Sequence, residues 1–164
     1  MGVLAMPTES RSTPQGPAPP ILAAVDGSPA STAAVETAVR LGVDLGASVV
    51  FVYVRRGPAS FLGAPVYQRR LTAEMARARN VLDRALRAAA WNRVAAEAEI
   101  LEGSPRKRIV EFARDRGAGM VVLGRRPRRL GRSVSRAVVR AARRPVVVAP
   151  KPLRRAGATA PALR

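Results

Sequence analysis

Neither cysteine nor histidine occurs among the 164 residues of this chain. Their absence excludes disulfide bonds, thiolate chemistry, zinc sites built from Cys or His, and acid–base catalysis by imidazole. Aromatic residues are also scarce, at 4% of the chain. We see no catalytic constellation in what remains, and we therefore predict that the protein is not a conventional enzyme.

Long apolar runs are missing as well. No segment approaches the roughly 18 apolar residues that a membrane-spanning helix needs, so we expect no transmembrane segment. The stretch from Met1 to Pro20 has neither the basic start nor the apolar centre of a signal peptide. A cytoplasmic location is the plain interpretation, and translation could start at Met1 or at Met6.

Acidic residues are absent from the last part of the chain. From Arg116 to Arg164 there are thirteen arginines, Lys151 and no acid, which places +14 of the net charge of +18 in this segment. Such an imbalance favours a polyanionic partner or an anionic ligand, although a solvated cationic surface is an equally open interpretation. Because few aromatic side chains are available to stack bases, any nucleic-acid binding should be non-specific.

The composition divides the chain into three parts. Residues 1–20 are rich in Pro, Ser, Thr and Gly and should form a disordered tail, whereas residues 151–164 form a second, basic tail. Between them, residues 21–150 alternate strand and helix signals. This alternation predicts an α/β domain with a doubly wound parallel sheet, a Rossmann-like arrangement.

Five segments have the length and composition of strands. They are Ile21–Val25, Val49–Val54, Ala96–Leu101, Met120–Leu123 and Val146–Ala149. The third alternates apolar and acidic residues, which is typical of a strand near a sheet edge.

Helices are expected between these strands. The first should begin at the cap signal Ser28-Pro29 and end at Gly46, and the third should begin at the similar signal Ser104-Pro105. Residues 55–70 contain several Gly and Pro and are expected to be irregular, so the second helix should start at about Thr72.

The last helix is expected from Ser133 to about Arg143. Arginines recur along it at helical spacing, namely Arg132, Arg136, Arg140 and Arg143. Its apolar side should pack on the sheet through Val134, Ala137, Val138 and Ala141. The arginine stripe would suit nucleic acid, an acidic protein or an acidic membrane surface.

Two turns carry the candidate site. Gly124 ends the fourth strand and leads through an arginine-rich loop to Ser133, which opens a helix. A strand that ends in glycine before a helix N-terminus is a common phosphate-binding arrangement. Asp26 ends the first strand, and ligands of such sheets bind at the carboxyl ends of strands where the strand order switches.

The segments Ile21–Pro29, Val49–Val54, Gly103–Pro105 and Met120–Pro150 together resemble the universal stress protein family, over roughly residues 20 to 151. The resemblance implies a stress-response module with a five-stranded sheet in the order 3-2-1-4-5. It implies a homodimer that forms through the last strand, Val146 to Ala149. It also implies ATP at the switch point, with Mg²⁺ only where ATP binds and with slow ATP hydrolysis at most.

The resemblance also assigns roles to single residues. Asp26 matches the aspartate that contacts the nucleotide, and Val54 matches the position whose backbone meets adenine. In the phosphate loop, Gly-x2-Gly-x9-Gly-Ser/Thr, Gly124 matches the first glycine and Ser133 the final hydroxyl, which Val134 follows.

The loop departs from the family pattern. Pro127 and Arg132 stand where the second and third glycines belong, and nine steps separate Gly124 from Ser133 instead of fourteen. Proline supplies neither a positive φ nor an N–H donor. Gly131 replaces the lost glycine in part, one position early.

Two interpretations of this loop stay open. Phosphate could be bound by side chains in place of backbone, through Arg125, Arg126, Arg128, Arg129 and Arg132. Alternatively, the protein is a cationic adaptor that binds no ATP and binds polyanions through Arg125 to Arg144. Asp26 could equally satisfy the amides of its own turn, and Ser133 could serve as a helix N-cap.

Overall fold

The computed structural model describes residues 17–56, 64–125 and 134–150. Its strands are β1 (Ile21–Val25), β2 (Val49–Arg55), β3 (Ala96–Glu102), β4 (Met120–Gly124) and β5 (Val146–Ala149). Its helices are α1 (Pro29–Leu45), α2 (Ala64–Trp91), α3 (Pro105–Asp115) and α4 (Val134–Ala141).

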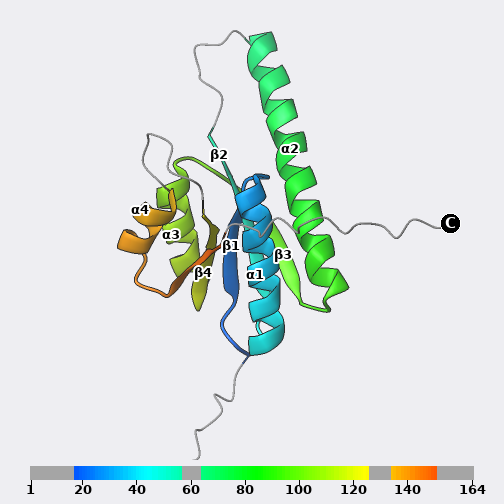
Figure 1. Cartoon of the computed structure of the whole chain (residues 1–164). Helices are drawn as coiled ribbons and strands as arrows, with labels where there is room; N and C mark the ends of the chain where they lie inside the picture. Colours follow the sequence, from blue (N-terminus) through cyan, green and yellow to red (C-terminus); the bar gives the residue numbers. More distant parts are fainter. Residues whose placement is uncertain (1–16, 57–63, 126–133, 151–164) are drawn as a thin grey trace, which may run out of the picture.

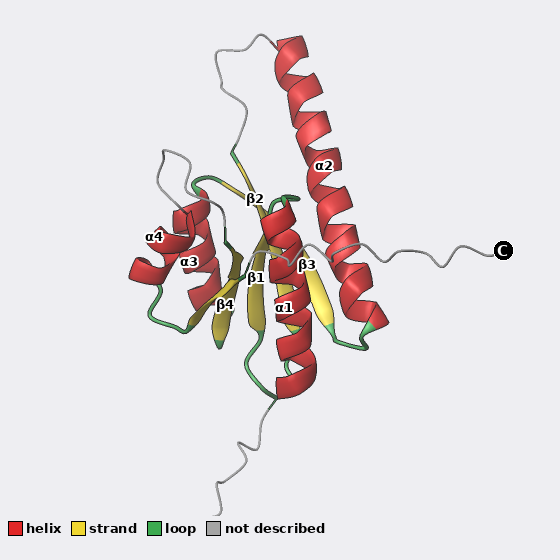
Figure 2. Cartoon of the chain, in the orientation of Figure 1, coloured by secondary structure: helices red, strands yellow, loops and turns green. Residues whose placement is uncertain are grey.

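The five strands form one parallel sheet in the order β3-β2-β1-β4-β5. This confirms the doubly wound α/β fold and places β3 at an edge, as its alternating sequence predicted. Helices α1 and α2 cover one face of the sheet, and α3 and α4 cover the other (Figures 1 and 2). The order switches between β1 and β4, so the carboxyl ends of these two strands lie next to each other.

The core consists of two apolar clusters, one on each face of the sheet. The side chains of successive β1 residues point to opposite faces of the sheet. Ile21 lies in the cluster under α1 and α2, and Leu22 lies in the cluster under α3 and α4. Both side chains are fully buried, which is why this strand reads as an unbroken apolar run. Small residues such as Ala34 and Ala78 let the helices lie close to the sheet.

Helix α1 begins and ends where the sequence predicts. Ser28 is its N-cap, with the side-chain Oγ accepting a hydrogen bond from the Ser31 N–H at 3.2 Å, and Pro29 is the first helical residue. Gly46 ends the helix in the left-handed region, with φ of 62°. The corresponding signal at Ser104 predicted the start of α3 correctly, because Ser104 occupies its N-cap position. Its side chain, however, makes no capping hydrogen bond.

Helix α2 starts earlier than predicted. It begins at Ala64 and not near Thr72, so the second half of the segment expected to be irregular is helical. Pro65, taken as a breaker, lies in the first turn, where its missing N–H would have no helical partner in any case. The helix projects beyond the sheet at its N-terminal end (Figure 1). Neither this helix nor any other in the described ranges is long and apolar enough to cross a membrane.

Helix α4 is shorter than predicted and differs in its buried face. Val138 is fully buried as expected, but Ala141 is exposed and Ala142 packs against the core in its place. Because the helix ends at Ala141, Arg143 lies beyond it and does not continue the arginine stripe. Arg144 donates a hydrogen bond to the Ala118 carbonyl, so this arginine has a structural contact.

Residues 1–16 of the predicted N-terminal tail and the whole predicted C-terminal tail, residues 151–164, lie outside the described residues. The last four residues of the predicted N-terminal tail are described, and they contact the domain. Ala18 packs against the α1–α2 side of the core, and the Pro20 carbonyl accepts a hydrogen bond from the Gly119 N–H at 2.9 Å. The ordered domain therefore begins a few residues before β1.

The two serine caps give a matched stability test. Ser28→Ala removes a capping hydrogen bond and should lower the free energy of unfolding by about 0.5–2 kcal/mol. Ser104→Ala removes no such bond and should change it by less than about 0.5 kcal/mol. Urea denaturation followed by circular dichroism measures both, and equal losses in the two variants would contradict the assignment.

Candidate functional site at the carboxyl edge of the sheet

The turn between β1 and α1 is fixed by Asp26. Its Oδ1 accepts a hydrogen bond from the Ser28 N–H at 2.9 Å, which is the turn role that the sequence left open. Gly27 has φ of 77°, and a Cβ there would lie 2.8 Å from Cγ2 of Val81 on α2. Only glycine fits this position, because the turn packs directly against α2.

Gly124 brings the end of β4 against the first turn of α1. A Cβ at Gly124 would lie 2.1 Å from the carbonyl oxygen of Ala30, so any side chain would force the two segments apart. The Gly124 carbonyl also accepts a hydrogen bond from the Ser135 hydroxyl of α4 at 3.1 Å. Close packing therefore explains why position 124 is a glycine. This residue ends β4 and contacts both α1 and α4 at the switch point.

Only part of the predicted phosphate loop can be placed. Six of the predicted site residues lie outside the described residues, namely Arg126, Arg128, Arg129, Gly131, Arg132 and Ser133, and so does Pro127. The side chain of Arg125 is exposed, and its backbone N–H donates to the Ala149 carbonyl at 3.3 Å. Val134 is the first residue of α4 and is half-buried against the α3–α4 side of the core.

Because β2 pairs with β1, its carboxyl end lies beside the end of β1, where Val54 is expected to meet adenine. Val54 is half-buried, and its side chain packs on the α3–α4 side of the sheet. Arg55 follows it and pairs with Glu102 of β3, directly across from it in the ladder. Its Nη1 atom is buried and has no hydrogen-bond partner among the described residues. The sequence prediction missed Arg55, which looks like an ordinary polar residue after a strand.

Charged side chains surround Tyr53 on the α2 side of the sheet. Burial raises the pKa of Tyr53 above its usual range, the positive charge of Arg77 opposes this shift, and the negative charges of Glu74 and Asp26 add to it. The β1 turn and α2 therefore act on the same phenol. The sequence prediction did not include α2 in the site, because a helix face rich in arginine usually indicates only solvent exposure.

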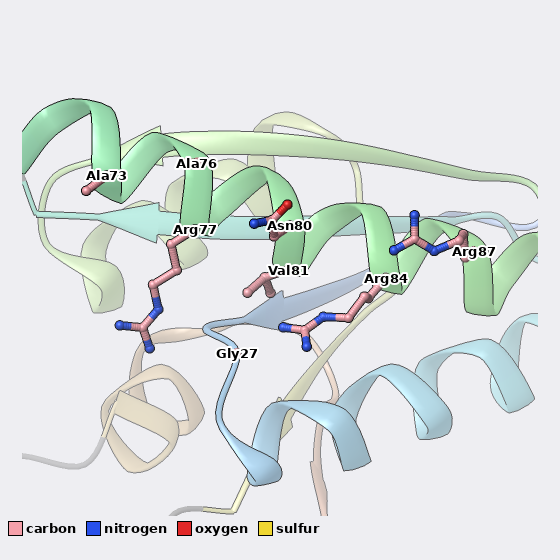
Figure 3. Close-up of a pocket in the computed structure, with 8 residues that line it drawn as sticks. All are labelled: Gly27, Ala73, Ala76, Arg77, Asn80, Val81, Arg84 and Arg87. Atoms are coloured by element: carbon pink, nitrogen blue, oxygen red, sulfur yellow. The ribbon is translucent and has the colours of Figure 1, made fainter.

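A hollow of about 630 Å³ lies between α2 and the β1–α1 turn. Gly27 forms its wall on the turn side. The residues that α2 contributes are Ala73, Ala76, Arg77, Asn80, Val81, Arg84 and Arg87. Arg77 and Arg84 extend from α2 on either side of the Gly27 turn in the view of Figure 3.

The sequence pattern of the universal stress protein family matches residues 18–150. The chain therefore belongs to this family, as the resemblance predicted. A search of curated proteins found no significant match.

Solved structures of the family share the fold. A universal stress protein family member from Burkholderia pseudomallei is 30% identical, with a TM-score of 0.68, over 80% of this chain and 95% of that one. Universal stress protein UspA from Lactobacillus plantarum is 26% identical, with a TM-score of 0.72, over 82% and 99%. The Archaeoglobus fulgidus protein in complex with dAMP is 24% identical, with a TM-score of 0.65, over 80% and 98%. Further structures of this fold contain cAMP and AMP.

The charges around Tyr53 predict its titration. In a Tyr67→Phe background, which leaves Tyr53 as the single tyrosine of a chain that has two, the phenol should ionise above the value of about 10 found in an unfolded chain. The folded state then holds the proton more tightly, so stability should fall as the pH rises above about 10. Arg77→Ala should raise the pKa of Tyr53 further, whereas Arg84→Ala should leave it unchanged. Absorbance at 295 nm measures the titration, and a lower pKa in Arg77→Ala would contradict this geometry.

Proposed function

We propose that this protein binds an adenine nucleotide at the switch point between β1 and β4 and acts as a stress-response binding module. The observation that carries the proposal is the meeting of the Asp26 turn, Gly124 and the start of α4 at one place on the carboxyl edge of the sheet. Family members with this fold bind dAMP, cAMP and AMP. Ligands of open α/β sheets bind at such a switch point.

The residues present fit the adenosine part of a nucleotide. Asp26 uses one carboxylate oxygen within its turn, and the carboxylate can still accept hydrogen bonds at its remaining lone pairs. Val54 is the last residue but one of β2, which pairs with β1, and backbone groups at this end of the strand can meet adenine. A buried donor without a partner, as in Arg55 Nη1, is a reason to look for an acceptor from outside the described residues.

The phosphates would be bound differently from the family pattern. Proline and arginine replace two loop glycines, so we assign phosphate binding to guanidinium groups and not to backbone N–H groups. Such binding should weaken as salt is added. Mg²⁺ would come with ATP through phosphate oxygens, because the described residues contain no cluster of three metal-ligating side chains.

We assign a binding role and not a catalytic one. No histidine or cysteine is present to activate a nucleophile or to transfer a proton. Slow ATP hydrolysis is the most that the residues support.

We include a homodimer through β5 in the proposal, because this strand lies at an edge of the sheet. Within the described residues, β5 pairs with β4 on one side and with no strand on the other. Val148 of this strand is 39% exposed. An edge strand with free N–H and C=O groups is a natural site for a second copy of the chain.

Polyanion binding through the C-terminal third is the second candidate function, and the charge distribution favours it. Arg125, Arg136, Arg140 and Arg143 all have exposed side chains in the structure. Such a surface would attract DNA, an acidic protein or an acidic membrane without a nucleotide pocket, and attraction to DNA would fall steeply with salt.

Calorimetric titration with ATP and with tripolyphosphate tests the nucleotide proposal. Wild-type protein should bind ATP more tightly than tripolyphosphate, because adenosine contributes contacts that tripolyphosphate lacks. Asp26→Asn keeps an oxygen for the Ser28 N–H but removes the charge and one acceptor oxygen. It should weaken ATP binding by about tenfold, the value of one hydrogen bond to a charged group.

The same variant provides its own control. Tripolyphosphate binding should stay the same or tighten in Asp26→Asn, since a negative charge has been removed near an anion. If ATP binds no more tightly than tripolyphosphate, nucleotide recognition is wrong and only attraction of anions remains.

A further inference from the structure

Three arginines of α2 line the hollow beside the Gly27 turn. They are Arg77, Arg84 and Arg87, and no acidic side chain is among the described residues that line it. Within the described part of the chain, none of the three takes part in an ion pair, whereas Arg55 and Arg116 are each paired with glutamate. All three side chains are exposed, and a concave surface with three guanidinium groups that form no ion pair is suited to attract an anionic ligand.

The spacing of these side chains fits an elongated ligand. Seven residues separate Arg77 from Arg84 and three separate Arg84 from Arg87, which corresponds to about 10 Å and about 5 Å along a helix. The volume of about 630 Å³ falls within the range of small-molecule sites. A single anion could satisfy one of the arginines, whereas a chain of anionic groups could reach all three.

Further features of the hollow favour phosphate over the bases of a nucleic acid. The described residues of the lining include no aromatic side chain on which a base could stack. Asn80 also lines the hollow and has a neutral amide donor.

We infer that this hollow is a binding site for a chain of phosphate groups, recognised by the α2 arginines. Its described lining residues come from α2 and the β1–α1 turn and not from the segment that the family pattern uses for phosphate, so the inference goes beyond the proposed nucleotide function. The phosphate chain could be a free oligophosphate or the triphosphate tail of a nucleotide, and both present the same chemistry to the arginines.

Calorimetric titrations with tripolyphosphate, ATP and AMP distinguish these sources. The double variant Arg77→Ala/Arg84→Ala should weaken tripolyphosphate binding at least tenfold, or about 1.4 kcal/mol. If ATP binding falls in parallel while AMP binding does not, the ligand is the tail of a nucleotide. If ATP binding is unchanged, the ligand is a free oligophosphate. Both results support the site.

Arg79→Ala is the matched control, because Arg79 lies on the same helix, is exposed and does not line the hollow. It should leave tripolyphosphate binding within about twofold of wild type. Thermal melts of all variants check that the fold is retained, and Arg77→Lys/Arg84→Lys separates charge from guanidinium geometry: it should recover only part of the affinity.

Two results would overturn the inference. One is tripolyphosphate binding that is equally reduced in Arg79→Ala and in the double variant, which would indicate general attraction to a cationic protein. The other is binding of double-stranded DNA but not of tripolyphosphate. Failure of the nucleotide proposal looks different, because ATP would then bind no better than tripolyphosphate while the dependence on Arg77 and Arg84 stayed intact.

Discussion

The close contact between Gly124 and the first turn of α1 is the constraint on which the site depends. The missing side chain lets the Ala30 carbonyl lie where a Cβ would be. This contact places the β1–α1 turn beside the end of β4, and the hydrogen bond from Ser135 brings the start of α4 to the same point. A crevice between β1 and β4 exists in every sheet of this order, but its walls here are set by that packing.

The described arginines fall into two groups, those paired with a carboxylate and those without an ion pair. The core is apolar and built largely from small residues, and no arginine among the described residues is buried. Some are neutralised, as in the pairs of Arg55 with Glu102 and Arg116 with Glu97. Arg77, Arg84 and Arg87, which line the hollow beside Gly27, form no ion pair with a described residue. Part of the excess positive charge of the chain therefore lies next to the proposed site.

Local signals in the sequence predicted the fold well, and tertiary contacts explain where they failed. Ser28 and Pro29 marked the start of α1 correctly because a cap acts within one turn. Pro65 misled because proline suits the first turn of a helix as well as a loop. In the candidate site, Asp26 and Gly124 could be proposed from the sequence because each lies at the end of a buried strand. The position of Arg77 beside the Gly27 turn could not, because it depends on how α2 lies across the end of β1.

The central claim is that a nucleotide occupies the carboxyl edge of β1, β2 and β4. Titration of ¹⁵N-labelled protein with AMP, followed through the backbone amide resonances, tests it most directly because AMP carries little of the charge that would attract it elsewhere. The largest shifts should fall at Gly27, Val54 and Gly124. Shifts confined to exposed arginines of α3 and α4, or equal to those at the remote Gly117, would contradict it.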